Sequence, residues 1–263
     1  MSERSSAEER TRLWSGFLGE GSEEWLTGFL LDHSNLPGPR ANLTLVWKTS
    51  SLLAESWSAH RGQLKPCLES WRESGDEYLL LTLHTALGYI IAEHPEEDDW
   101  ALKILYEGNF SPLWRAREGV TLGLGAALGE RPELVLGVLR EWCSEDSPLL
   151  IRNALMVLAD PERLEGRRAL VEELEEYVSR AMNLVRNATP EDRGAPGFKV
   201  LKKTLGFVIS IAAVEDEAFL GRMEEWIGAG VKAWRSILRS NLKKKRMRRR
   251  FGPRIDELLA KTG

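Results

Sequence analysis

Aromatic residues recur at a nearly constant interval in the middle of this chain, and this repeat constrains the fold more than any other feature. Trp71, Tyr106 and Trp142 lie 35 and 36 residues apart, and each ends a stretch with apolar residues at helical spacing. Five residues after each aromatic comes a residue that we expect to begin the next helix: Asp76, Ser111 and Ser147. Both serines precede Pro-Leu, so serine is the predicted N-cap and proline the first helical residue. Since one helix pair cannot bury its own apolar face, the repeat predicts stacked pairs.

The rest of the sequence also shows helical periodicity and almost no alternating strand pattern. Segment 170–184 repeats apolar residues every three or four positions, and 78–91 (YLLLTLHTALGYII) is apolar on nearly every side, as in a helix packed between neighbours. Turn-forming segments interrupt the helical pattern at 35–39, 93–96 and 188–197. We therefore predict an all-α protein, built as a right-handed α-solenoid of antiparallel helix pairs.

The predicted solenoid is a single domain that covers residues 1–263. Residues 1–60 do not follow the aromatic repeat, so we expect them to form an atypical N-terminal cap. Residues 231–263 form a basic C-terminal segment.

Four glycines fall within the single helix predicted after Ser111. They are Gly119, Gly123, Gly125 and Gly129. No strand precedes them and no Gly-Lys-Ser/Thr follows, so they do not form a phosphate-binding loop. We expect small residues at this spacing to allow close approach between neighbouring helices.

The sequence indicates a cytoplasmic protein with no membrane partner. No stretch approaches the roughly 20 apolar residues that are needed to cross a bilayer. The first residues, MSERSSAEERTRLW, are charged and lack the apolar core of a signal peptide. Cys67 and Cys143 form neither a CxxC pair nor a disulfide framework, which fits a reducing compartment.

The formal net charge of −4 conceals a strong separation of charge along the chain. Between Glu225 and Asp256 there is no acidic residue, yet this window holds eleven basic ones. Removing these eleven from the chain's 36 Lys and Arg leaves 25 bases against 40 Asp and Glu. The local field of the C-terminal segment therefore indicates more about partners than the average charge does.

The run KKKRMRRR is the strongest candidate for a binding function. It contains Lys243, Lys244, Lys245, Arg246, Arg248, Arg249 and Arg250. Cations at this density neutralise phosphates and release condensed counterions, which gives salt-sensitive binding without sequence preference. Two other interpretations remain open: the run can pair with the protein's own acidic residues or with a protein partner, or it can be a solvated helix end.

Arginines and tryptophans of the repeat helices can extend this basic surface. The candidates are Arg115, Arg235 and Arg239 for phosphates, and Trp114 and Trp234, which arginines flank, for stacking on a base. For the ten tryptophans as a group, packing within and between repeats is the default expectation. Arg117 and Arg152 are expected to make structural hydrogen bonds between repeats.

Nothing in the sequence indicates a catalytic or metal site. His94 lies among Glu93, Glu96, Glu97, Asp98 and Asp99, but all of these fall in one segment, which we interpret as a solvated loop before the next helix. No histidine has a serine or cysteine at a spacing that is recognisable for nucleophilic catalysis. We therefore expect neither a catalytic activity nor a cofactor.

The element LWRAREGV at 113–120, which opens a predicted helix, is similar to HEAT repeats, in which an arginine near a helix start ties down adjacent turns. More narrowly, 97–159 and 215–246 resemble the HEAT-like proteins grouped with bacterial DNA alkylation repair enzymes. The likeness rests on Trp114, Arg117, Glu118, the Arg-Glu-Trp helix end at 140–142 and the sequence NLKKKR at 241–246. This resemblance implies a curved solenoid with a basic concave face against a duplex.

The catalytic members of that group hold a cationic alkylated base between an aspartate and tryptophans. This chain lacks a Trp-Trp-Asp type of cluster, and Asp99-Trp100 is the nearest pairing. Catalysis is therefore not carried over. We predict a non-catalytic protein that binds nucleic-acid phosphates, with DNA favoured over RNA. Two alternatives stay open: a protein–protein scaffold and a glycosylase-like repair enzyme.

Overall fold

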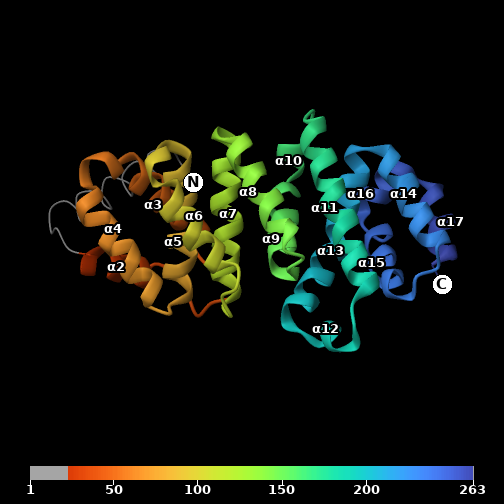
Figure 1. Cartoon of the computed structure of the whole chain (residues 1–263), viewed down its shortest axis with the longest axis horizontal. Coiled ribbons are helices and arrows are strands. Elements are labelled where there is room, and N and C mark those ends of the chain that lie inside the picture. The colour runs from red at the N-terminus through yellow and green to blue at the C-terminus, as the bar shows by residue number, and fades with distance from the viewer. Residues whose placement is uncertain (1–22, 263) are drawn as a thin grey trace. The chain divides into compact units, whose positions relative to one another are not determined.

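The computed structural model describes residues 23–262. This part of the chain is all-α, with helices packed in sequential order and no strand (Figure 1). It divides into two compact units, with the boundary after Leu136. The first 22 residues of the predicted N-terminal cap, including Trp14, lie outside the described residues. The prediction of a single domain over the whole chain stays a prediction, and each unit is described by itself.

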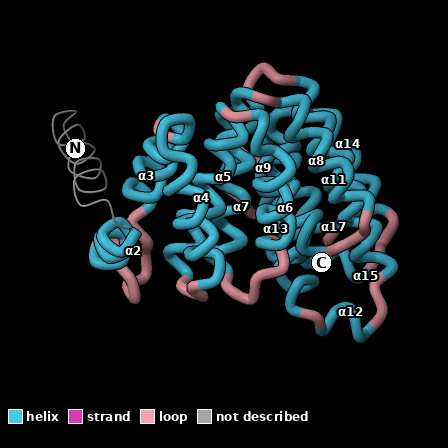
Figure 2. The backbone as a smooth tube through the Cα atoms, turned by 60° about the vertical axis from the view of Figure 1, so that its left-hand side comes forward, coloured by secondary structure: helices cyan, strands magenta, loops and turns pink. Residues whose placement is uncertain are grey.

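The first unit is built around one central helix. Its elements are α2 (Glu23–Asp32), α3 (Leu43–Glu55), α4 (Trp57–Glu73), α5 (Glu77–Glu93), the 3-10 helix η1 (Pro95–Glu97), α6 (Asp98–Gly108), α7 (Trp114–Glu130) and the first turn of α8 (Pro132–Ser144). Helix α5 packs against α3 and α7, and also against α2, α4 and α6 (Figure 2). Residues 78–88 of α5 are all buried, which confirms the prediction of a helix packed between neighbours.

Glycines bring α5 and α7 into direct backbone contact. A Cβ atom at Gly88 would lie 2.0 Å from the Gly123 carbonyl oxygen, and one at Gly119 would lie 2.6 Å from the Leu81 carbonyl oxygen. Real Cβ atoms do not approach other atoms so closely, so these positions accept only glycine. The expected role in close helix approach is confirmed for Gly119 and Gly123. It does not hold for Gly129, where a Cβ atom would meet nothing within 4 Å.

The second unit surrounds α13. It continues α8 and contains α9 (Pro148–Leu158), α10 (Pro161–Leu164), α11 (Arg168–Asn187), α12 (Pro190–Gly194), α13 (Pro196–Glu215), α14 (Glu217–Gly228), α15 (Lys232–Leu242), α16 (Lys245–Phe251) and α17 (Pro253–Lys261). Helix α13 packs against α9 and α15, while α11 and α14 also pack against α13 and α15. The segment 188–197, predicted as a break, holds the short α12 between two long helices.

The predicted helix starts are right at two of three places. Asp76 caps α5, since its carboxylate accepts hydrogen bonds from the backbone N–H groups of Tyr78 and Leu79. Ser147 is the N-cap of α9, although its side chain makes no capping hydrogen bond. Ser111 is not an N-cap, because α7 begins three residues later; its hydroxyl accepts instead from the Leu113 N–H group.

The acidic segment after α5 is not the solvated loop that the sequence suggested. Glu97 is buried, and its carboxylate accepts hydrogen bonds from Trp57 Nε1 at 3.3 Å and Lys65 Nζ at 2.8 Å. Asp98, the first residue of α6, forms a bidentate ion pair with Arg131. The segment is therefore a structural junction, held by the buried Glu97 carboxylate and the half-exposed Asp98–Arg131 pair.

None of the helices in the described part of the chain is long and apolar enough to cross a membrane.

Candidate functional site

Helix α15 presents a basic side to solvent because its apolar residues all point the other way. Its buried residues are Trp234, Ile237, Leu238, Asn241 and Leu242. Its exposed residues are Lys232, Arg235, Ser236 and Arg239, and the helix contains no acidic residue. This division follows helical periodicity, since positions three and four apart share one side.

Polar side chains at the end of α15 fasten this helix to the main chain of α13. The Asn241 carboxamide accepts a hydrogen bond from the Ser210 N–H group at 2.8 Å and donates to the Leu205 carbonyl at 2.7 Å. The Ser240 hydroxyl donates to the Gly206 carbonyl at 2.8 Å. Because Asn241 is fully buried, these bonds hold the start of the basic run in a defined position.

The basic run continues from α15 through a tight turn into α16. Its side chains are exposed, apart from Lys244, which is half-buried, and Met247, which is buried and anchors α16. The sequence left open whether these cations pair with the protein's own carboxylates. Only Arg248 of the seven does so, with its guanidinium 2.7 Å from Asp256. No carboxylate of residues 23–262 lies within ion-pairing distance of the other six: Lys243, Lys244, Lys245, Arg246, Arg249 and Arg250.

Arg254 lies next to the run but belongs to the internal charge pairs of the unit. Its guanidinium is 2.8 Å from Glu224 and 3.6 Å from Glu217 on α14. The hydrogen bond from Arg254 lowers the pKa of Glu224 below its usual range, so the carboxylate stays charged. Arg254 is therefore compensated and contributes little to an outward positive field.

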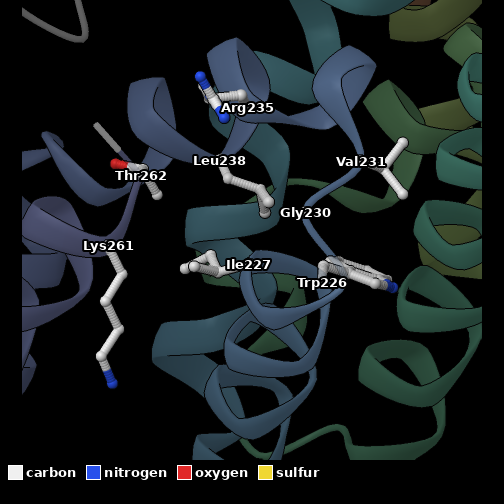
Figure 3. Close-up of a pocket in the computed structure, with 8 residues that line it drawn as sticks. All are labelled: Trp226, Ile227, Gly230, Val231, Arg235, Leu238, Lys261 and Thr262. Atoms are coloured by element: carbon white, nitrogen blue, oxygen red, sulfur yellow. The ribbon is translucent and has the colours of Figure 1, made fainter.

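The two arginines predicted on α15 are both exposed, and neither has an ion-pair partner among the described residues. Arg235 lines a small pocket of about 50 Å³ where α14, α15 and α17 meet. Figure 3 shows Arg235 and Lys261 on different sides of this pocket, with Ile227 and Leu238 between them. Its volume is too small for a nucleotide, so Arg235 is a surface cation and not part of a closed ligand site.

The remaining predicted residues differ in how they can contribute. Trp234 is 3% exposed and donates from Nε1 to the Met182 carbonyl at 2.7 Å, so its ring is packed in the core and cannot stack on a base. Arg115 is buried, and its guanidinium lies 3.0 Å from Glu77. Trp114 is 52% exposed, with the Arg115 guanidinium over its ring. Trp114 and Arg115 both belong to the first unit, whereas the basic run belongs to the second.

Sequence reasoning missed three lysines on α13: Lys199, Lys202 and Lys203. Lys199 and Lys203 are exposed and Lys202 is half-buried, and none has an ion-pair partner among the described residues. One sequence feature indicates a basic segment here: no acidic residue occurs between Asp192 and Glu215.

Neither a cluster of metal ligands nor an activated cysteine occurs among the described residues. Within residues 23–262, no group of three or more His, Cys, Asp or Glu side chains could hold a metal ion. Burial raises the pKa of both Cys67 and Cys143 to about 12, so neither thiol provides a thiolate nucleophile. What this surface can do is electrostatic: it can hold a multiply charged anion.

Comparison of the chain with known protein families, curated proteins and solved structures finds no match.

Proposed function

We propose that this protein binds the phosphate backbone of nucleic acid through the basic run of residues 243–250 together with Arg235 and Arg239 of α15. The observation that carries the proposal is the group of six exposed or half-buried cations in the run that have no carboxylate partner among the described residues. Like charges at this density repel one another, so the surface costs stability unless an external anion is bound. Several phosphates in a row match such a strip of cations.

The proposed ligand is DNA ahead of RNA, and the binding is independent of base sequence. Trp234 is excluded as a stacking residue because it is buried, so the surface offers cations without a base-reading group at that position. Arg115 is left out as well, since Glu77 compensates its charge. We propose no catalytic step and no cofactor.

We further propose that the helix pairs are HEAT-like repeats of a right-handed solenoid. The sequential packing of the helices supports this reading. Arg117, near the start of α7, donates back to the Ser111 carbonyl, as an arginine that ties down adjacent turns would do. The three repeat aromatics each lie close to the end of a helix: α4, α6 and α8.

A salt titration tests the proposed function. Binding of a 20-base-pair duplex is measured for the wild type and for the variant Lys243→Gln, Lys244→Gln, Lys245→Gln at several salt concentrations. If the three lysines contact phosphates, the slope of log K against log salt becomes shallower by about 2.7. The matched control removes the same charge from three exposed positions elsewhere: Arg40→Gln, Lys103→Gln and Arg167→Gln.

The control variant is expected to keep the wild-type slope. Wild-type affinity that does not depend on salt, or no binding at all at low salt, would contradict the proposal.

Exposed aromatic residues of the first unit support a second function, protein binding. Trp47 on α3 is 44% exposed, Phe110 46% and Trp114 52%. Large apolar side chains in such positions are typical of protein interfaces. Pull-down from nuclease-treated lysate with the wild type and with Trp47→Ala, Trp114→Ala tests this function, since only a partner that contacts these rings is lost from the variant.

A further inference from the structure

The three lysines that sequence reasoning missed form one row along α13. Lys199, Lys202 and Lys203 are followed by Gly206, at helical spacings of three, four and seven residues, so all four lie on the same side of the helix. This side is open to solvent, because two of the lysines are exposed, and Lys202 and Gly206 are half-exposed.

The lysine row borders the basic side of α15. Gly206 is the point of contact, since its carbonyl accepts the hydrogen bond from Ser240 at 2.8 Å. A Cβ atom at Gly206 would lie 3.4 Å from the Ser240 hydroxyl, so the Ser240 side chain itself fills the contact between the two helices. Ser240 is one turn from Ser236 and adjacent to Arg239. The row of α13 and the basic side of α15 therefore meet at Gly206 and Ser240, which are both half-exposed.

Charge is separated between the two sets of helices in this unit. The three helices α9, α13 and α15 carry seven Lys and Arg and a single acidic residue, Glu215, at the last position of α13. Helices α11 and α14, which pack against α13 and α15, carry seven Glu and four Arg. On a surface that is charged only for solubility, acidic and basic side chains are mixed on every helix, and this is not the case here.

We propose that the lysine row of α13 is a second part of the phosphate-binding surface, which extends the nucleic-acid site from the C-terminal run across two neighbouring helices. This inference rests on the proposed function and adds residues that the basic run does not include. Its ligand is a phosphodiester backbone, because the ammonium groups of the row recognise charge and not bases.

Helix α13 also packs against α16, so the lysine row and the run lie on neighbouring helices. Lys199, Lys202 and Lys203 lie on the 20-residue helix α13, whose core side is buried from Phe198 onward. The run lies on α16 and on the two residues that precede this helix. Removing charge from one row leaves the backbone of the other row in place. The two contributions can therefore be measured separately.

The experiment measures binding of the same 20-base-pair duplex to four proteins. The first two are the wild type and the α13 variant, in which Lys199, Lys202 and Lys203 are all changed to Gln. The other two are the 243–245 variant described above and the matched control, in which Arg40, Lys103 and Arg167 are changed to Gln. Lysine and glutamine have similar helix propensity, so the substitutions keep α13 helical, and circular dichroism verifies this. The α13 variant is expected to have a salt slope shallower by about 2.7 than that of the wild type. A double variant, Lys199→Gln with Lys203→Gln, avoids the half-buried Lys202 and is expected to lose about 1.8.

The outcomes separate the two proposals. If the 243–245 variant loses slope and the α13 variant keeps the wild-type slope, the α13 site is overturned while the proposed function stands. If the wild type itself shows no salt-dependent binding, both fall. If the α13 variant and the control lose affinity equally, the effect is one of net charge alone and the α13 site is again overturned.

A polyglutamate of equal charge serves as a competitor: it should displace the duplex weakly, and displacement as strong as that by free duplex would overturn phosphodiester recognition.

Discussion

Two pairs of packed helices show opposite ways of bringing helices together: α5 with α7 in the first unit, and α13 with α15 in the second. In the first pair, glycines remove side chains from the contact, and the backbones touch. In the second pair, Ser240 and Asn241 cross the contact and bind main-chain groups of α13. The first solution leaves α5 almost wholly buried and nearly uncharged, while the second leaves a basic side of both helices in solvent. Packing of sequential helices can therefore form a buried core in one unit and leave a charged surface in the other.

The largest expected effect is at the glycine contact. In Gly88→Ala the added Cβ atom would lie 2.0 Å from the backbone of Gly123, so α5 and α7 must move apart and lose packing. We expect destabilisation of about 3 kcal/mol, measured by urea unfolding. The matched control is Gly129→Ala, where a Cβ atom meets nothing and helix propensity predicts stabilisation of up to ~1 kcal/mol. Equal effects of the two substitutions would contradict the role of close approach.

The next effect is at the polar contact. Asn241→Ala leaves the Ser210 N–H group and the Leu205 carbonyl without this buried partner. We expect a loss of about 2 kcal/mol, because buried polar groups without hydrogen bonds keep their desolvation cost. The half-exposed neighbour provides the comparison: Ser240→Ala removes one hydrogen bond that water can replace, and should cost about 1 kcal/mol or less. If Asn241→Ala is neutral, the anchoring of α15 has been assigned to the wrong side chain.

A pH effect is expected in the glycine-packed pair and not in the basic pair. Burial lowers the pKa of His84, on α5, from 6.5 to about 4. The unfolded chain therefore binds a proton between these values that the folded state does not, so stability falls as the pH drops through this window. The expected slope is at most about 1.4 kcal/mol per pH unit.

Urea unfolding of wild type and His84→Gln between pH 7 and pH 5 measures this contribution, since the variant lacks the titrating ring. The measured range from pH 7 to pH 5 lies above the pH at which Glu69, Glu97 and Glu173 titrate, because the pKa of each carboxyl is lowered from 4.5. Parallel stability curves for the two proteins would show that His84 does not titrate as described.

The smallest effect is on the stability cost of the basic surface. Lys203 is an exposed residue four positions after Lys199, and like charges at this spacing repel. Lys203→Gln is therefore expected to raise stability by about 0.3 kcal/mol while weakening binding of the duplex. Thermal unfolding at low salt measures the first quantity. A clear loss of stability would indicate that Lys203 has a structural role in place of a binding role.

Local patterns predicted those features that depend on neighbouring residues alone. The aromatic repeat placed the ends of α4, α6 and α8, and Asp76 was recognisable as a cap because an aspartate there can reach the first free N–H groups. The same reasoning failed at Ser111, where serine followed by proline looks like a helix start but forms a turn before the helix. The buried state of Glu97 could not be seen, since its partners Trp57 and Lys65 come from another helix.

Periodicity, caps and composition within short windows predict the helical class of this protein, the ends of the repeat helices and the separation of charge along the chain. Only the tertiary structure decided which cations of the second unit lack carboxylate partners, that Trp234 is buried, and that the lysines of α13 adjoin the basic side of α15. These facts depend on which helices become neighbours. Ion pairing and burial act over a few ångströms in space, whereas Gly206 and Ser240, which join α13 to α15, are 34 positions apart in the chain.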